Sequence, residues 1–409
     1  MRWGAVALLV VFAAVAAASL VARSPERERQ AQRYFSPDEI ARGRQLSLER
    51  RAIFWSGTLV ELALLLWLAL SGVAPRLAAL ADRWTGQRWM LSVLCVGAIC
   101  FVAQEVLGFP LRLYGGLYLQ RAWGLTNRSL ASWVGDYAKG LAVSSVIGAL
   151  LLVLLFLALR LLPRTWWLAA TVGSAVLGVF FAFVFPLLIA PLFNRFVPLE
   201  QTSHAALLPR IEAMAKQAGL PVHDVLVMDA SRQGRHTNAY FAGFGRTRRI
   251  VLYVTLLNSH PPDEVLSILA HEMGHWRHHH IAKGIALGTA GALVVFFVLS
   301  RLLIWASGSG AAGFERPDEP AAIPFILLLA FVGGFAVMPI QNWVSRTFER
   351  QADQSALELG GSPAVFVAAE ERLVRDNISN PAPSDLSVFL FASHPTPIDR
   401  IEMAVAAEK

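Results

Sequence analysis

The chain has 409 residues, of which 55% are apolar and 16% charged, and its formal net charge is +7. The length alone would suit two or three soluble domains, but so apolar a composition excludes an ordinary soluble protein and indicates an integral membrane protein. The positive charge does not call for nucleic acid as a partner, because arginines that flank membrane spans and face anionic lipid headgroups account for most of it. The lipid bilayer is therefore the first expected partner.

Seven apolar segments come close to the roughly 20 residues that a helix needs to cross a bilayer. They occupy, approximately, residues 3–22, 53–74, 89–111, 140–162, 166–190, 284–305 and 321–344. The first segment could instead be a signal peptide, because its alanine-rich end resembles a cleavage site. Eight arginines in residues 23–51 argue against cleavage, since the positive-inside rule holds them on the cytoplasmic side and cleavage would export them. We therefore expect the N-terminus outside, and the polar segment 191–283 and the C-terminus in the cytoplasm.

The polar segment 191–283 shows the alternating pattern of a small α/β unit. A helical stretch at 204–219 is followed by three short strands, at residues 223–229, 238–245 and 248–257. Gly243 and Gly245 predict a hairpin between the second and third strands. Pro261 and Pro262 then open a helix that carries the stretch HEMGHWRHHH, residues 271–280.

This stretch contains the H-E-x-x-H signature of zinc proteases. His271 and His275 stand four residues apart, so both imidazoles project from one helix face and can share a single ion. Glu272 lies next to the first ligand, where its carboxylate can act as general base. A chance match in a chain with ten histidines is the alternative. The three histidines at 278–280 are interpreted as an interfacial run where the helix meets the membrane.

Zinc catalysis requires a third protein ligand. On a continuous helix His278 would lie about 10 Å from His271, which is too far to close a tetrahedron easily. The metzincin arrangement is excluded because its third histidine would fall on Ile281. The remaining common solution takes a glutamate from a second helix.

The stretch SRTFERQAD after the last span supplies such a glutamate, Glu349, and places Asp353 one turn later, where it could orient a ligand histidine. The alternative is a solvated helix face shared with Arg346 and Arg350. The last two spans form a hairpin that returns the chain to the same membrane face. This return brings residue 349 beside residue 271 and favours the ligand.

Four motifs, in chain order, now carry a family resemblance: HTNAYFAGFGRTRRIVLYVTLL, HEMGHW, SRTFERQAD and SHPTPIDRI. Together they resemble the integral-membrane CAAX prenyl protease type I family, which are zinc metalloendopeptidases of the gluzincin kind. The resemblance implies one zinc ion per chain, held by His271, His275 and Glu349, with Glu272 as catalytic base. It also implies a ring of seven helices around a large water-filled chamber.

Peptide hydrolysis forms an oxyanion that needs a hydrogen-bond donor besides the metal. The family pattern supports His394 in SHPTP and Asn238 in TNAYF as candidates. The alternatives are a turn residue before proline for His394 and a turn cap for Asn238. The strand 238–244 could also be an edge strand that receives the substrate as an added strand.

The expected fold class is mostly α, a polytopic membrane protein with a small α/β metalloprotease domain. We divide it into an N-terminal membrane region (1–190), a catalytic α/β region (191–283), a transmembrane helix pair (284–344) and a C-terminal catalytic region (345–409). The expected substrate is a peptide or protein, with or without a lipid, and a monomer is compatible with the sequence. The alternatives are a quality-control protease without prenyl preference and a metal-binding transporter or scaffold.

Overall fold

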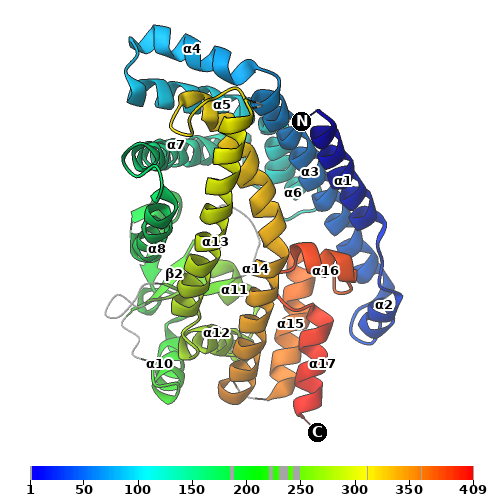
Figure 1. Cartoon of the computed structure of the whole chain (residues 1–409). Helices are drawn as coiled ribbons and strands as arrows, with labels where there is room; N and C mark the ends of the chain where they lie inside the picture. The colour runs from blue at the N-terminus through cyan, green and yellow to red at the C-terminus, as the bar shows by residue number, and fades with distance from the viewer. Residues whose placement is uncertain are drawn as a thin grey trace.

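The computed structural model describes residues 2–184, 188–220, 224–229, 238–242, 249–310, 312–360 and 362–408. Long helices fill the upper part of the molecule in Figure 1, and a small sheet and shorter helices lie below them. The fold is thus mostly helical and polytopic, with one small α/β unit, as the composition and periodicity predict.

The N-terminal half consists almost entirely of helices. These are α1 (Arg2–Val21), α2 (Pro25–Ala31), α3 (Pro37–Leu70), α4 (Val73–Thr85), α5 (Trp89–Leu113), the π-helical turn η1 (Tyr114–Tyr118), α6 (Leu119–Ala122), α7 (Leu130–Leu161), α8 (Trp166–Val184) and α9 (Ala190–Phe193). Helix α3 starts with a capping box, in which Ser36 and Glu39 satisfy each other's backbone amides.

Six helical stretches of the described chain are long and apolar enough to cross a membrane. They lie at Trp3–Ala31, Pro37–Leu70, Trp89–Ala122, Leu130–Leu161, His280–Ser309 and Pro320–Leu359. The remaining predicted span, 166–190, corresponds to the apolar helix α8, which is described as far as Val184. The structure therefore agrees with the expected set of spans, whereas the large chamber stays a prediction.

A four-stranded sheet lies below the membrane helices, in the order β1-β2-β4-β3. Its strands are β1 (Phe196–Pro198), β2 (Asp224–Met228), β3 (Ala239–Ala242) and β4 (Arg249–Tyr253). Strand β4 runs parallel to β2 and antiparallel to β3. The predicted pairing of β3 with β4 and the edge position of β3 are confirmed, although Gly243 and Gly245 lie outside the described residues.

Two details of this unit differ from the prediction. Strand β1 was not predicted, and the apolar run 248–257 is only half strand, because β4 ends at Tyr253 and α11 (Val254–Ser259) follows. Short 3₁₀ turns η3 (Leu199–Gln201) and η4 (Ala205–Leu207) precede α10 (Leu208–Gln217). Helix α12 (Pro262–Arg277) then begins at the predicted proline.

A long hairpin returns the chain to this unit. It consists of α13 (His280–Ser309), a 3₁₀ turn η6 (Pro320–Ala322) and α14 (Ile323–Leu359), and α14 packs along α12. The first half of α14 is apolar and its second half carries the polar stretch SRTFERQAD, so one helix connects the membrane to the candidate site. The chain ends with α15 (Pro363–Asn377), α16 (Asp385–Phe391) and α17 (Pro397–Ala407).

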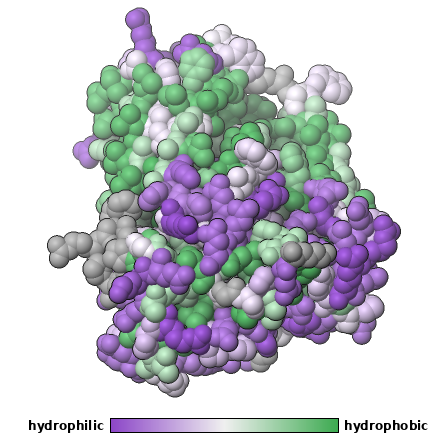
Figure 2. Space-filling view, turned by 90° about the horizontal axis from the view of Figure 1, so that it is seen from below, coloured by the Kyte–Doolittle hydropathy of each residue, from purple (hydrophilic) through white to green (hydrophobic). Residues whose placement is uncertain are grey.

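The arginine-rich segment 23–51 lies against the C-terminal helices. Ion pairs join Arg27 to Asp385 at 2.7 Å, and Arg375 to Glu39 at 2.8 Å. Seen from below, this side of the molecule is largely hydrophilic, and apolar surface gathers in the upper part of the view (Figure 2). The basic segment and the candidate site therefore share one side of the molecule.

Candidate metal centre

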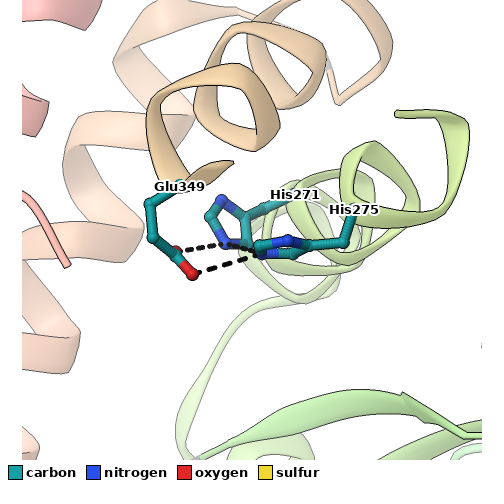
Figure 3. Close-up of side chains that lie close together, drawn as sticks. All are labelled: His271, His275 and Glu349. Carbon is teal, nitrogen blue, oxygen red and sulfur yellow. Dashed lines mark hydrogen bonds and ion pairs between the residues drawn. The ribbon is translucent and has the colours of Figure 1, made fainter. Parts of the chain in front are cut away.

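The two histidines of the motif and the glutamate of the second helix meet at one point. In Figure 3 the carboxylate of Glu349, from α14, faces the imidazoles of His271 and His275, from α12. The Nε2 atoms of the histidines lie 3.2 Å apart. The oxygens of Glu349 lie 3.2 Å from the Nε2 of His271 and 3.4 Å from the Nε2 of His275.

These distances match the requirements of a tetrahedral ion. Ligand atoms about 2.0–2.1 Å from a zinc-like ion occupy tetrahedron corners that are about 3.3 Å apart. The three observed distances, of which the one to His271 involves Oε2 of Glu349 and the one to His275 involves Oε1, lie within 0.1 Å of that value. In the metal-free protein the two Nε2 atoms can share one hydrogen bond, and a bound cation would replace its proton. The donor set therefore fits a metal ion and leaves a fourth position open.

The electrostatics of the two histidines differ. Burial opposes charge on His271, but the carboxylates of Asp353 and Glu349 outweigh burial and raise the pKa of His271 to about 10. Burial and the neighbouring His271 lower the pKa of His275 to about 4. The site therefore favours positive charge at His271, beside the two carboxylates, and provides a neutral imidazole at His275.

Asp353 lies where a partner for a ligand histidine is expected. Its carboxylate accepts a hydrogen bond from the Nδ1 of His271 at 2.7 Å, which leaves Nε2 for the metal. Arg400, on α17, holds the same carboxylate in a bidentate contact at 2.5 and 3.0 Å. A second carboxylate, that of Glu370, pairs with Arg400 at 2.6 Å. The ligand His271 is thus fixed by a buried charged network.

Comparison with known proteins identifies the chain. The sequence model of peptidase family M48 matches residues 202–408, which include all three candidate ligands. The model described as "CAAX prenyl protease N-terminal, five membrane helices" matches residues 19–195.

The chain belongs to peptidase family M48. An uncharacterized metalloprotease, YhfN, of Bacillus subtilis is 29% identical over 381 residues, which cover 92% of this chain and 87% of the relative. The CAAX prenyl protease 1 of Saccharomyces cerevisiae is 28% identical over 75% of this chain and 71% of its own length. The CAAX prenyl protease 1 homolog of Homo sapiens is 26% identical, with coverages of 85% and 82%.

The fold of this M48 peptidase has also been seen in a crystal. The structure of S. mikatae Ste24p superimposes with a TM-score of 0.83 at 24% sequence identity, and the match covers 98% of this chain and 97% of that one. The membrane helices, the family and the geometry agree, so the protein is a membrane metallopeptidase. The alternative of a transporter or scaffold that only binds a metal is therefore rejected.

Beside the metal centre of this peptidase lies a cavity of about 470 Å³, whose lining includes Glu272, Asn238 and His394. Burial raises the pKa of Glu272 to about 7, which suits a group that must accept and return a proton near neutral pH. His394 is 60% exposed at its side chain, and its Nδ1 lies 2.7 Å from a carboxylate oxygen of Glu349. The oxygen of the Asn238 side chain accepts a hydrogen bond from the amide of Ala239 at 2.9 Å, as a turn cap would.

The loop that carries His394 is anchored to the ligand helix. Arg346 is only 8% exposed, and its guanidinium donates to the carbonyl oxygens of Val388 and Ala392 at 3.0 and 2.5 Å. The polar half of α14 is therefore not the solvated face considered as an alternative, although Arg350 is exposed. The anchor fixes the position of His394 relative to Glu349.

The histidine run lies where α12 ends and the candidate membrane span of α13 begins, but His280 differs from the expected interfacial residue. Helix α12 ends at Arg277, and His279 adopts a left-handed backbone conformation with φ of 55° before α13 begins at His280. His280 is 5% exposed and contacts His275, so its side chain faces the interior of the protein. Neither His280 nor Glu370 nor Arg400 was predicted from the sequence to take part in the site. Arg400 belongs to the quoted motif SHPTPIDRI, which was the only signal for it.

Proposed function

We propose that the metal is zinc, one ion per chain, and that His271, His275 and Glu349 bind it. The observation that carries this proposal is the set of 3.2 to 3.4 Å distances that join the two Nε2 atoms to each other and to the two oxygens of the Glu349 carboxylate. The donor set of two imidazoles and one carboxylate with an open fourth position is typical of catalytic zinc. Asp353 serves as the orienting partner of His271.

In the proposed reaction, zinc held by His271, His275 and Glu349 would supply a Lewis acid for the scissile carbonyl. Glu272 accepts a proton from the attacking water and passes it to the leaving amine nitrogen. A pKa near neutrality allows it to do both.

His394 donates a hydrogen bond to the oxyanion. Its position is suitable because Nδ1 is engaged by Glu349, while Nε2 makes no hydrogen bond within the described chain. Asn238 is the second candidate donor. Its side-chain oxygen accepts the hydrogen bond from the amide of Ala239, and its side-chain nitrogen is the group that could donate to the oxyanion. Both residues line the cavity that contains Glu272.

The substrate is proposed to bind as an additional strand along β3. This strand stands at one end of the sheet and pairs with β4 alone among the described strands, so its other edge can accept a peptide. Asn238 directly precedes β3, which would place the bound backbone beside the proposed oxyanion donor.

We further propose that the site faces the cytoplasm. The proposed substrates are proteins with a lipidated C-terminus, and the enzyme removes a C-terminal tripeptide, an upstream segment or both. Support for the orientation comes from the segment 23–51 with its eight arginines, which is joined by ion pairs to the C-terminal helices. Support for the substrate comes from the yeast and human relatives, both named CAAX prenyl proteases. The rival is a quality-control protease that cleaves membrane proteins irrespective of lipid.

Two measurements on the purified full chain test this function. Cleavage of a peptide should require the metal and should be lost in Glu272→Gln when that variant still binds one zinc ion. Wild-type rates in this variant would contradict the mechanism. Matched peptides with and without a farnesyl group then test the substrate class. Faster cleavage of the farnesylated peptide supports the CAAX-type function, and equal rates favour the quality-control function.

A further inference from the structure

The second ligand histidine, His275, also has a hydrogen-bond partner, which the H-E-x-x-H motif does not predict. The Nδ1 of His275 lies 2.9 Å from the Nδ1 of His280, and the Nε2 of His280 lies 2.9 Å from the side-chain oxygen of Gln351. Gln351 belongs to α14, between Glu349 and Asp353. These contacts form a chain of three side chains that begins at the metal centre and ends on the ligand helix α14.

The hydrogen positions in this chain follow from its two ends. Because the Nε2 of His275 faces the other ligands, it carries no proton in the metal site, and its Nδ1 must carry one. The Nδ1 of His280 therefore accepts that hydrogen bond. The Nε2 of His280 then carries the ring's single proton and donates it to the amide oxygen of Gln351, which can only accept. Every group in the chain is neutral and satisfied.

The backbone is shaped to bring the two rings together. Two residues five positions apart on a continuous helix point about 140° away from each other, so His280 could not reach His275 without a break. The break is supplied by the end of α12 at Arg277 and by the left-handed conformation of His279. The ring of His280 is then clamped parallel to Phe348, with centroids 4.3 Å apart and planes 6° apart. The ring is held in one orientation by packing as well as by hydrogen bonds.

We propose that His280 is a positioning residue for the metal ligand His275. By accepting the Nδ1 hydrogen of His275, it fixes the tautomer and the ring plane that direct the Nε2 lone pair at the metal. It plays for His275 the part that Asp353 plays for His271, but without a charge. This proposal rests on the zinc site proposed above.

His280 is not a fourth ligand in this arrangement. Its nearest nitrogen faces the Nδ1 of His275, on the side of that ring opposite to Nε2. The group of donor atoms close enough to share an ion contains His271, His275 and Glu349 only, within the described chain. The open coordination position therefore stays available for the reaction.

The test compares three variants of the full chain in detergent. His280→Phe keeps a ring that can stack on Phe348 but removes the acceptor. His280→Asn loses the ring but places its side-chain oxygen near the former Nδ1, where it can accept from His275. His279→Asn is the matched control, because His279 is exposed and asparagine tolerates its left-handed backbone conformation. Zinc affinity is measured by competition with a chromophoric chelator, and the melting temperature is measured on the metal-free proteins.

Removal of a hydrogen-bond partner of a metal ligand typically weakens metal binding by about 10- to 100-fold. We expect that loss for His280→Phe even where the metal-free protein remains folded, recovery of most of the affinity in His280→Asn, and wild-type affinity in His279→Asn. A zinc affinity of His280→Phe within about threefold of wild type would overturn the proposal.

If His280→Phe does not fold, His280→Asn decides. Near-wild-type zinc affinity in that variant supports the proposal, and a loss of 10-fold or more overturns it. Failure of the wild-type chain itself to bind one zinc ion would instead refute the proposed function. The two failures are therefore distinguishable.

Discussion

The strongest test of the metal centre is a single added methyl group between its two helices. Gly274 lies on α12 inside the motif, next to the ligand His275, and faces α14. A Cβ atom at this position would lie 2.8 Å from the Cα of Ala352 and 2.9 Å from the Cβ of Ser355. The first of these is a backbone atom, so no side-chain rotation can relieve the contact.

The magnitude follows from these distances. Ordinary contacts of a Cβ atom begin at 3.4 Å, so Gly274→Ala must separate the helices locally by about 0.6 Å. If that shift falls on the ligands, the 3.2 and 3.4 Å edges from Glu349 to the two histidines widen to about 3.8 and 4.0 Å. Metal–ligand distances tolerate changes of only about 0.2 Å. Overpacking of this kind also costs about 1–3 kcal/mol of stability.

We therefore expect Gly274→Ala to weaken zinc binding by at least about tenfold, or about 1.4 kcal/mol, while the protein remains folded. Chelator competition measures the affinity, and thermal unfolding of the metal-free protein measures the stability. Gly284→Ala on α13 is the control, because a Cβ atom there meets nothing within 4 Å. Wild-type zinc affinity in Gly274→Ala would refute the argument that the distance between α12 and α14 sets the geometry of the site.

Three further predictions concern the network, the stability and the metal. Arg400→Leu leaves the buried carboxylates of Asp353 and Glu370 without their counter-ion, and we expect it to cost about 3–5 kcal/mol, seen as a lower melting temperature that Arg400→Lys partly restores. Burial lowers the pKa of His260 in the folded state. The neutral His260 therefore contributes fully to the free energy of unfolding above pH 6.5, the pKa of the unfolded state, and this contribution is lost as the pH falls below that value. The loss is at most about 1.4 kcal/mol per pH unit. His260→Phe should therefore flatten the decline of the melting temperature between pH 6.5 and 5, and an unchanged slope would contradict this. Removal of the metal by a chelator should abolish cleavage and lower the melting temperature reversibly. Relative to the protein with free zinc at 100 times its Kd, the loss of stability should be about 2.7 kcal/mol. An unchanged melting temperature would argue against a metal bound to the folded state.

The membrane spans and the three ligands could be predicted because each has a short-range signature. Spans are recognised from length and hydropathy alone. The pair His271 and His275 depends only on helix periodicity, which fixes their common face. Glu349 required one step more, namely that two consecutive spans form a hairpin and return to the same membrane face. All of these features follow from regular geometry.

The features that could not be predicted depend on irregular or long-range geometry. The run 248–257 reads as one strand, but a short apolar run does not distinguish strand from helix, and the chain turns into α11 after Tyr253. The break after α12 carries neither glycine nor proline, and His279 adopts the left-handed conformation instead. If α12 is assumed to continue past Arg277, the side chain of His280 is placed about 140° around the helix from His275. Arg400 lies 129 residues after His271, and only tertiary packing brings the two together.

The lengths of the two helices in the α13–α14 hairpin constrain the geometry of the metal site. Helix α13 has 30 residues and rises about 45 Å, and Glu349 lies 26 residues after the start of α14, about 39 Å back along the return path. The ligand on α14 meets the ligands on α12 because these two lengths nearly cancel. One residue more or less in the apolar half of α14 would rotate Glu349 by about 100° and shift it by about 1.5 Å. Asp353, the partner of His271, and Gln351, the partner of His280, would rotate with it, so both hydrogen bonds would be lost together. The register of a membrane helix therefore determines the geometry of a metal site outside the apolar region.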